Sequence, residues 1–161
     1  MLLRPLEAED TDRMVQLLTN STIAQTYMLP EYEDPKDALP QFRRMMELSH
    51  NPDRYIRAIC LDGMLIGFVN DPEIHDATIE VGYVIDPAFH NQGYMTAALK
   101  IVIADLFAKG YNKVIAGAFT ENPASIRVME KCGMLPIEQT DMIEYRGKTH
   151  VCIYRCIQKP E

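Results

Sequence analysis

The segment Ile79-Glu80-Val81-Gly82-Tyr83-Val84-Ile85-Asp86-Pro87 runs through a short loop into His90-Asn91-Gln92-Gly93-Tyr94-Met95-Thr96. Its first part is rich in β-branched and aromatic residues and ends in Asp-Pro, which predicts a strand that stops at residue 85. A long amphipathic stretch follows, so a helix is expected to begin next to Gly93. The pattern therefore predicts a strand, a short loop and a helix in direct succession.

Glycine at the start of that helix predicts a binding site for an anion. The first four N–H groups of a helix have no partner within it, and they lie at the positive end of the helix dipole. Because Gly93 has no side chain, a phosphate or pyrophosphate group can approach this backbone closely. The leading hypothesis from this loop is a cofactor that carries a nucleotide.

A second segment, Asn122-Pro123-Ala124-Ser125-Ile126-Arg127-Val128-Met129-Glu130-Lys131-Cys132-Gly133, predicts a short helix. Asn122 is a favourable N-cap, Pro123 suits the first helical position, and Gly133 is a typical stop.

The rest of the chain supplies strands and helices on both sides of these segments. Asp62-Gly63 is the strongest two-residue hairpin signal. A single helix joins the strand starting at Thr78 to the next strand, and such a crossover requires the two strands to be parallel. The predicted order begins with strand 2–6, a helix that starts within residues 7–12 and another that opens at Pro35. Strands 54–61, 64–70 and 78–85 follow, then a helix ending at Lys109-Gly110, strand 113–118 and the helix after Asn122. The last two strands are 134–138 and 149–157, joined by 144–148. This order predicts a mixed α/β sheet with helices on both faces, and residues 1–161 are expected to form a single domain.

Composition narrows the class of protein. The chain has 161 residues, of which 47% are apolar and 24% are charged, as in ordinary globular domains. No apolar run is long enough to span a membrane, and the start of the chain does not resemble an export signal, so a cytoplasmic protein is expected. The net charge of −7 argues against nucleic acid as a partner. The four cysteines lack the spacing of a zinc site, so no metal is expected.

The residues quoted above resemble the GCN5-related N-acetyltransferase (GNAT) superfamily, and most closely its branch similar to ribosomal-protein N-terminal acetyltransferases. The motifs that carry the resemblance are Glu80 to Ile85, Gln92 to Thr96, and Asn122 with Ser125, Glu130-Lys131 and Gly133. The resemblance implies an α+β fold with a mostly antiparallel sheet of about seven strands and a central parallel pair that splays apart. It also implies transfer of an acetyl group from acetyl-CoA, and a homodimer is common in this family.

The same resemblance implies where acetyl-CoA would lie. Backbone groups of Val84 and Ile85 would hold the pantetheine arm, and the N–H of Ile85 would serve the oxyanion. Asn122 and Ser125 would contact the cofactor from the other side of the splay between the two parallel strands. The pyrophosphate would lie on the loop that comprises His90, Asn91, Gln92, Gly93, Tyr94, Met95 and Thr96. His90 and Met95 depart from the usual pattern of that loop, which has Arg or Gln and a small residue at these positions.

Glu80 and Ser125 are the candidate catalytic residues. At pH 7 only about one part in 10³ of a lysine-like amine is neutral, so a base that removes a proton is useful. Glu80 lies on the strand beside the proposed cofactor, and partial burial would raise its pKa toward the working range. Ser125 could help the thiol of CoA to leave. The alternatives are an ordinary solvated carboxylate for Glu80 and ordinary helix-start chemistry for Ser125 and Asn122.

The acceptor is expected to be a primary amine, with the N-terminal α-amine of a protein as first choice and a small-molecule amine as second, acetylated directly in a ternary complex. Met95, Ala97 and Met129 keep a second interpretation open, namely an acyl-CoA-binding sensor or scaffold without catalysis. A third is a binder of another phosphorylated ligand. His50, His75 and His150 have no evident partner in the sequence and are expected to be exposed.

Overall fold

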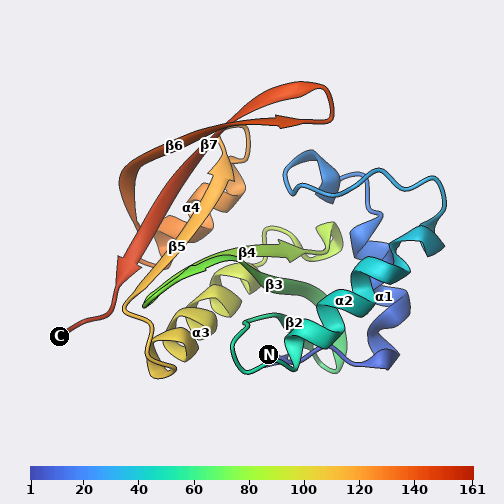
Figure 1. Cartoon of the computed structure of the whole chain (residues 1–161), viewed down its shortest axis with the longest axis horizontal. Coiled ribbons are helices and arrows are strands. Elements are labelled where there is room, and N and C mark those ends of the chain that lie inside the picture. Colours follow the sequence, from blue (N-terminus) through green and yellow to red (C-terminus); the bar gives the residue numbers. More distant parts are fainter. The chain divides into compact units, whose positions relative to one another are not determined.

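The computed structural model describes all residues, 1–161, and has the predicted order of elements (Figure 1). None of its helices is long and apolar enough to cross a membrane. In chain order the elements are β1 (Leu2–Arg4), η1 (Ala8–Asp10), α1 (Thr11–Leu18), η2 (Ile23–Gln25), η3 (Pro35–Ala38), α2 (Leu39–Ser49), β2 (Arg57–Leu61), β3 (Met64–His75), β4 (Thr78–Ile85), η4 (Pro87–Phe89), α3 (Tyr94–Ala108), β5 (Lys113–Phe119), α4 (Pro123–Lys131), β6 (Leu135–Tyr145) and β7 (Lys148–Gln158).

The seven strands form one sheet in the order β1-β2-β3-β4-β5-β7-β6. The pairs β1–β2, β2–β3, β5–β7 and β6–β7 are antiparallel, and β4–β5 is parallel. The parallel ladder runs from Thr78 beside Lys113 to Val81 beside Ala116, although both strands continue beyond it. The mixed, mostly antiparallel seven-stranded sheet that the sequence predicted is therefore confirmed.

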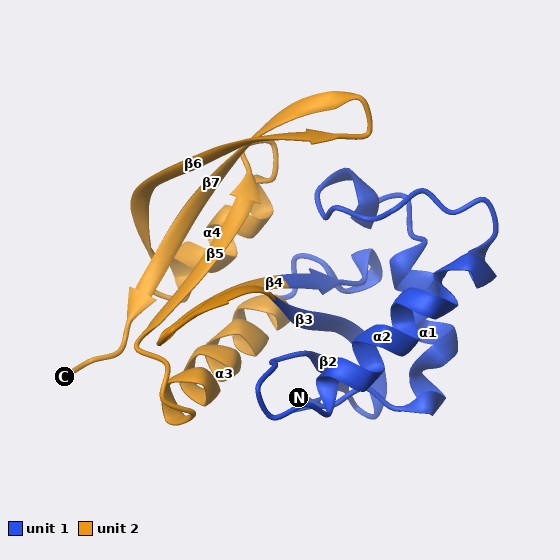
Figure 2. Cartoon of the chain, in the orientation of Figure 1, with its two compact units in different colours: residues 1–71, 83–92 blue, residues 72–82, 93–161 orange.

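The chain divides into two compact units (Figure 2), and each is described by itself. Unit 1 comprises Met1–Asp71 and Tyr83–Gln92; unit 2 comprises Pro72–Gly82 and Gly93–Glu161. In unit 1, side chains of α1, α2, β2 and β3 form one apolar core that includes Val84. In unit 2, the predicted apolar stripe of α3 is buried, namely Met95, Leu99, Val102, Ile103 and Leu106.

Two hairpin turns have the backbone that their sequences require. Asp62 and Gly63 have φ values of 51° and 82°, as the primed turns of two-residue hairpins demand, so the predicted β2–β3 hairpin is confirmed. Arg146 and Gly147 have φ values of 50° and 78° and form an equally tight turn. The predicted end of a strand at residue 138 is therefore wrong, because β6 continues to Tyr145. Residues 138–142 are mostly polar and exposed, so this part of β6 lacked the alternation that marks a half-buried strand.

Candidate active site

The end of β4 lies against a glycine of β3 in unit 1. A Cβ placed on Gly67 would lie 2.2 Å from the carbonyl oxygen of Val84 and 3.1 Å from the Cα of Ile85. The amide of Asp86 donates to the carbonyl of Ile66 over 2.7 Å. Only a glycine permits so close an approach, and the backbone of Val84 and Ile85 is held in place as a result.

An arginine of α1 fixes the residue that follows β4. Arg13 donates through Nη2 to Asp86 Oδ2 over 2.7 Å and through Nε to the carbonyl of Leu65 over 3.0 Å. Asp86 also accepts from the amide of Ala88 over 2.9 Å. Burial acts to raise the pKa of Asp86, but the hydrogen bonds from Arg13 and Ala88 and the charge of Arg13 outweigh it and lower that pKa. Arg13 therefore stabilises the ionised carboxylate and, with it, the turn after Ile85.

Replacing Arg13 by methionine is expected to raise the KM for acetyl-CoA and to lower the free energy of unfolding at pH 7 by about 1 kcal/mol, because Asp86 loses a charged partner. The folded-state pKa of Asp86 is lowered, so this stabilisation is present above the unfolded pKa and is lost as the pH falls through the folded pKa. Wild type and variant should therefore converge in acid. Urea unfolding across pH measures this, with Arg44→Met on the exposed surface of α2 as the control. A difference that persists in acid would contradict the ion-pair explanation.

The loop after β4 ends in a helix start without a side-chain cap. In unit 1, His90 donates through Nε2 to the carbonyl of Ile85 over 3.1 Å, and the side-chain amide of Gln92 donates to the carbonyl of Ala88 over 3.4 Å. Asn91 has a positive φ of 60°, a conformation that asparagine tolerates better than most residues. Both side chains thus donate to backbone carbonyl groups of residues 85–88 and stabilise the conformation of the loop.

In unit 2, Gly93 is the N-cap of α3 with a φ of 79°, and no atom from outside this stretch of chain lies within 4 Å of where its Cβ would be. The bond from the amide of Ala97 to the carbonyl of Gly93, 3.1 Å long, is the first α-helical bond. The amides of Met95 and Thr96 precede it and therefore have no acceptor within the helix. Met95 is buried, and its side chain does not fill the open space at Gly93. The backbone here can receive an anion.

Asn122 caps α4 as predicted. Its side-chain oxygen accepts from the amide of Ser125 over 3.2 Å, and its own amide donates to the carbonyl of Phe119 over 2.9 Å. The capping interaction in unit 2 is therefore independent of any contact of Asn122 with a cofactor. It brings Asn122 and Ser125 together after the end of β5.

Glu80 lies in a half-buried, acidic part of unit 2. Burial is the largest cause of its raised pKa, and the charges of Glu73 and Asp141 raise it further. The sequence predicted this direction from burial alone. The two neighbouring carboxylates were missed because they lie on β3 and β6, and nothing in their local sequence distinguishes them from solvated residues.

Tyr154 of β7 continues this patch. Its ring covers the backbone of β5, since a Cβ on Gly117 would lie 2.6 Å from Tyr154 Cε1. Its hydroxyl donates to Asp141 Oδ2 over 2.7 Å. The pKa of Tyr154 is raised by burial, by hydrogen bonds to Asp141 and Cys152, and by the charges of Cys152 and Glu80, so the charge of Glu80 acts on the same patch.

His150 contradicts the expectation that it would be exposed. It lies on β7 with 8% of its surface exposed, and Nδ1 is hydrogen-bonded to Glu121 Oε1. Its ring stacks on Phe119 with centroids 4.3 Å apart and planes 16° apart, and Tyr145 lies 5.9 Å away. His75, in contrast, is exposed as expected. Sequence reasoning missed the His150–Glu121 pair because its members are 29 residues apart and meet only through the pairing of β5 with β7.

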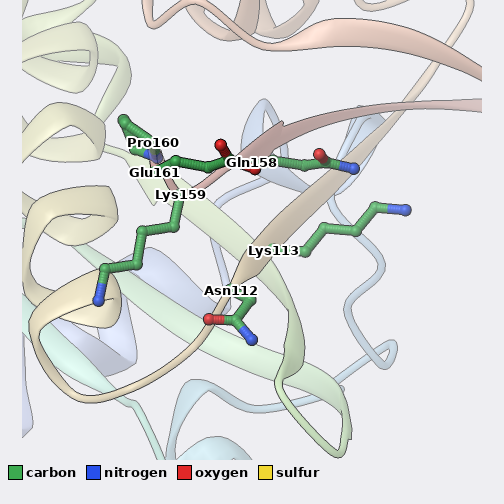
Figure 3. A pocket seen from close by; sticks show the side chains of 6 residues that line it. All are labelled: Asn112, Lys113, Gln158, Lys159, Pro160 and Glu161. Carbon is green, nitrogen blue, oxygen red and sulfur yellow. The ribbon is translucent and has the colours of Figure 1, made fainter.

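A pocket of about 350 Å³ lies elsewhere in unit 2, where β5 begins and β7 ends (Figure 3). None of the predicted site residues lines it. Asn122 and Ser125 follow the opposite end of β5, so this pocket is separate from the candidate site. Its lining consists of Asn112, Lys113, Gln158, Lys159, Pro160 and Glu161.

Residues 1–135 match the family model described as an acetyltransferase (GNAT) domain. No functionally curated protein matches the chain significantly.

Solved structures with the same fold include several acetyltransferases. Spermidine N-acetyltransferase from Vibrio cholerae, in complex with CoA and spermine, has a TM-score of 0.81 and 20% identity over 98% of this chain and 94% of that one. The microcin C7 self-immunity acetyltransferase MccE, in complex with acetyl-CoA and AMP, has a TM-score of 0.84 and 16% identity over 98% and 91%. The putative acetyltransferase yncA from Salmonella typhimurium, with acetyl-CoA, has a TM-score of 0.77 and 17% identity over 100% and 95%.

Proposed function

Because the chain belongs to the GNAT acetyltransferase family, we propose that it transfers the acetyl group of acetyl-CoA to a primary amine, directly and within a ternary complex. The observation that carries this proposal is the helix start at Gly93, where open space adjoins amides that have no acceptor within the helix. Similar structures that contain CoA or acetyl-CoA support the choice of cofactor. We further propose that residues 1–161 work as one acetyltransferase domain.

The residues present fit a diphosphate-bearing thioester. We assign the pyrophosphate to the loop from His90 to Thr96, the pantetheine arm to the backbone of Val84 and Ile85, and further contacts to Asn122 and Ser125. The donors in the loop are backbone amides, which suit phosphate oxygens. Acetyl-CoA, when bound, supplies an activated carbonyl carbon to the amine.

Groups of the chain would then stabilise the charge that develops during the reaction and accept the proton of the amine. The amide of Ile85 is assigned to the developing oxyanion, and Ser125 to the departing sulfur. Glu80 is the proposed base, acting directly or through water. Its raised pKa supports this role, because a base works best when its pKa lies near the working pH.

Carboxylates around Glu80 support a cationic acceptor. Glu73 and Asp141 lie close enough to raise the pKa of Glu80, and together the three groups would attract an ammonium ion. The N-terminal α-amine of a protein remains the first candidate. A small-molecule amine is the second, and the spermine in the Vibrio cholerae structure supports it.

Two measurements test the proposal. Acetyl-CoA should raise the melting temperature, whereas ATP and NAD at equal concentration should not. Free CoA should then appear when acetyl-CoA is mixed with one member of a panel of peptides and small amines. Thermal stabilisation without CoA release across the panel would instead favour the acyl-CoA-binding sensor, and stabilisation by ATP or NAD alone would favour another phosphorylated ligand.

A further inference from the structure

Acetylation of an ammonium ion removes two protons from its nitrogen. One must leave before the nitrogen can attack, because a protonated amine has no free lone pair. The other leaves after the N–C bond has formed and while the C–S bond breaks. The thiolate takes up one proton, so one proton is released to solvent for each acetyl group transferred. A single base such as Glu80 can hold only one of the two at a time.

The His150–Glu121 pair has the arrangement of a proton acceptor. Nδ1 of His150 donates to the carboxylate of Glu121, which leaves the lone pair of Nε2 available in the neutral ring. Nε2 has no hydrogen-bond partner in the protein and is not sealed from solvent. Stacking on Phe119 fixes the plane of the ring. A carboxylate on one nitrogen and an unoccupied second nitrogen is also how bases are oriented in nucleophilic enzymes.

The pair lies next to the residues assigned to the cofactor. Glu121 immediately precedes Asn122, and the turn that contains both is closed by the hydrogen bond from Asn122 to the carbonyl of Phe119. Ile115, Gly117 and Phe119 are two residues apart along β5 and therefore share one face of the strand. Ile115 pairs with Glu80 of β4, so Glu80 lies on the same face. Tyr154 and Cys152 of β7, whose pKa values respond to Glu80, pair with Gly117 and Phe119. Glu80 and His150 thus lie on the same face of unit 2, with His150 further along it, level with the turn at Glu121 and roughly 20 Å of strand from the level of Glu80.

We propose that His150, oriented by Glu121, accepts the proton that the acceptor ammonium loses, and that Glu80 accepts the proton released during attack, each directly or through water. This inference rests on the proposed amine acetylation. The titratable groups that face His150 are Glu121 from the turn after β5 and Tyr145 from β6.

The test is kcat/KM across pH for two amines of different basicity. For His150→Gln we expect a loss of roughly 10²-fold at pH 7. That deficit should shrink as the pH rises toward the pKa of the amine, since solvent then supplies neutral amine. It should also be larger for a lysine-like amine (pKa ~10.4) than for an α-amine (~8). Glu121→Gln should show the same pattern with a smaller amplitude, and it keeps the test valid if His150→Gln does not fold.

The matched control is His75→Gln. His75 also contacts a carboxylate, that of Asp76 at 3.6 Å, but its side chain is 84% exposed. Its replacement should change neither rate nor pH profile. An unchanged rate in His150→Gln, or a loss that is equal at every pH and for both amines, would overturn the proposal and leave a structural role.

A readout without turnover separates this inference from the proposed function. In protein labelled with ¹⁵N-histidine, CoA with a non-acetylated amine should shift the Nε2 resonance that is missing from His150→Gln. If wild type transfers no acetyl group to any amine, the proposed function fails. If wild type acetylates but the resonance does not move, only the role of His150 fails.

Discussion

Replacing Glu80 by glutamine is expected to lower turnover by roughly 10²- to 10⁴-fold while leaving acetyl-CoA binding intact, because the amide keeps the shape of the side chain but cannot accept a proton. Steady-state release of CoA and titration with acetyl-CoA measure the two quantities separately. Glu138→Gln, on the exposed part of β6, is the control for the loss of one negative charge. Turnover unchanged in Glu80→Gln would remove this residue from the mechanism.

The same variant should alter the dependence of stability on pH. The folded-state pKa of Glu80 is raised, so the folded protein keeps a proton that the unfolded chain has already lost. The free energy of unfolding therefore falls as the pH rises through the folded pKa, and the stabilisation is fully present only below the unfolded pKa. Glutamine does not titrate, so the variant should gain stability relative to wild type as the pH rises. Urea unfolding at several pH values tests the sign.

Replacing Gly67 by alanine is expected to abolish most activity through displacement of the end of β4. The new methyl carbon would lie 2.2 Å from the carbonyl oxygen of Val84, and since that atom belongs to the backbone, the strand itself must move. A shift of about 1 Å in a positioned group can reduce a rate by roughly 10²-fold. Overpacking of this kind also lowers the free energy of unfolding by about 1–3 kcal/mol.

A second glycine separates displacement from simple destabilisation. Gly63 of the β2–β3 turn has a φ of 82° and open space around its Cβ position, so Gly63→Ala lowers stability through backbone strain alone. At matched stability, only Gly67→Ala should weaken binding of acetyl-CoA. Equal affinity in the two variants, measured by calorimetry, would show that Val84 and Ile85 do not contact the cofactor.

Much of the fold was predictable because its signals are local. The Asp62-Gly63 turn, the apolar stripe of α3 and the cap at Asn122 each depend on residues within a few positions of one another. The parallel crossover followed from the order of elements alone. The length of β6 was not predictable, since its polar stretch pairs with β7 through backbone hydrogen bonds that any sequence can make.

In the candidate site, too, some features could be predicted from adjacent residues and others depend on residues distant in sequence. The helix start at Gly93 and the capping role of Asn122 could be predicted from adjacent residues, and both are present in the structure. Glu80 could be chosen as a base, but the charges of Glu73 and Asp141 that raise its pKa could not be foreseen. His150 was expected to be exposed, but it is buried and hydrogen-bonded to Glu121.

Local sequence thus specifies the elements, their order and the helix start at Gly93, because hydrogen bonding within a turn or a helix end involves neighbours in the chain. The close approach of Gly67 to Val84, the effect of the Asp141 charge on the pKa of Glu80, and the hydrogen bond between Glu121 and His150 join residues that are distant in sequence. They arise from the register between strands, and shifting a strand by one residue would turn strand side chains such as Glu80, Asp141 and His150 to the opposite face. The chemistry of the site therefore depends on how the strands pair.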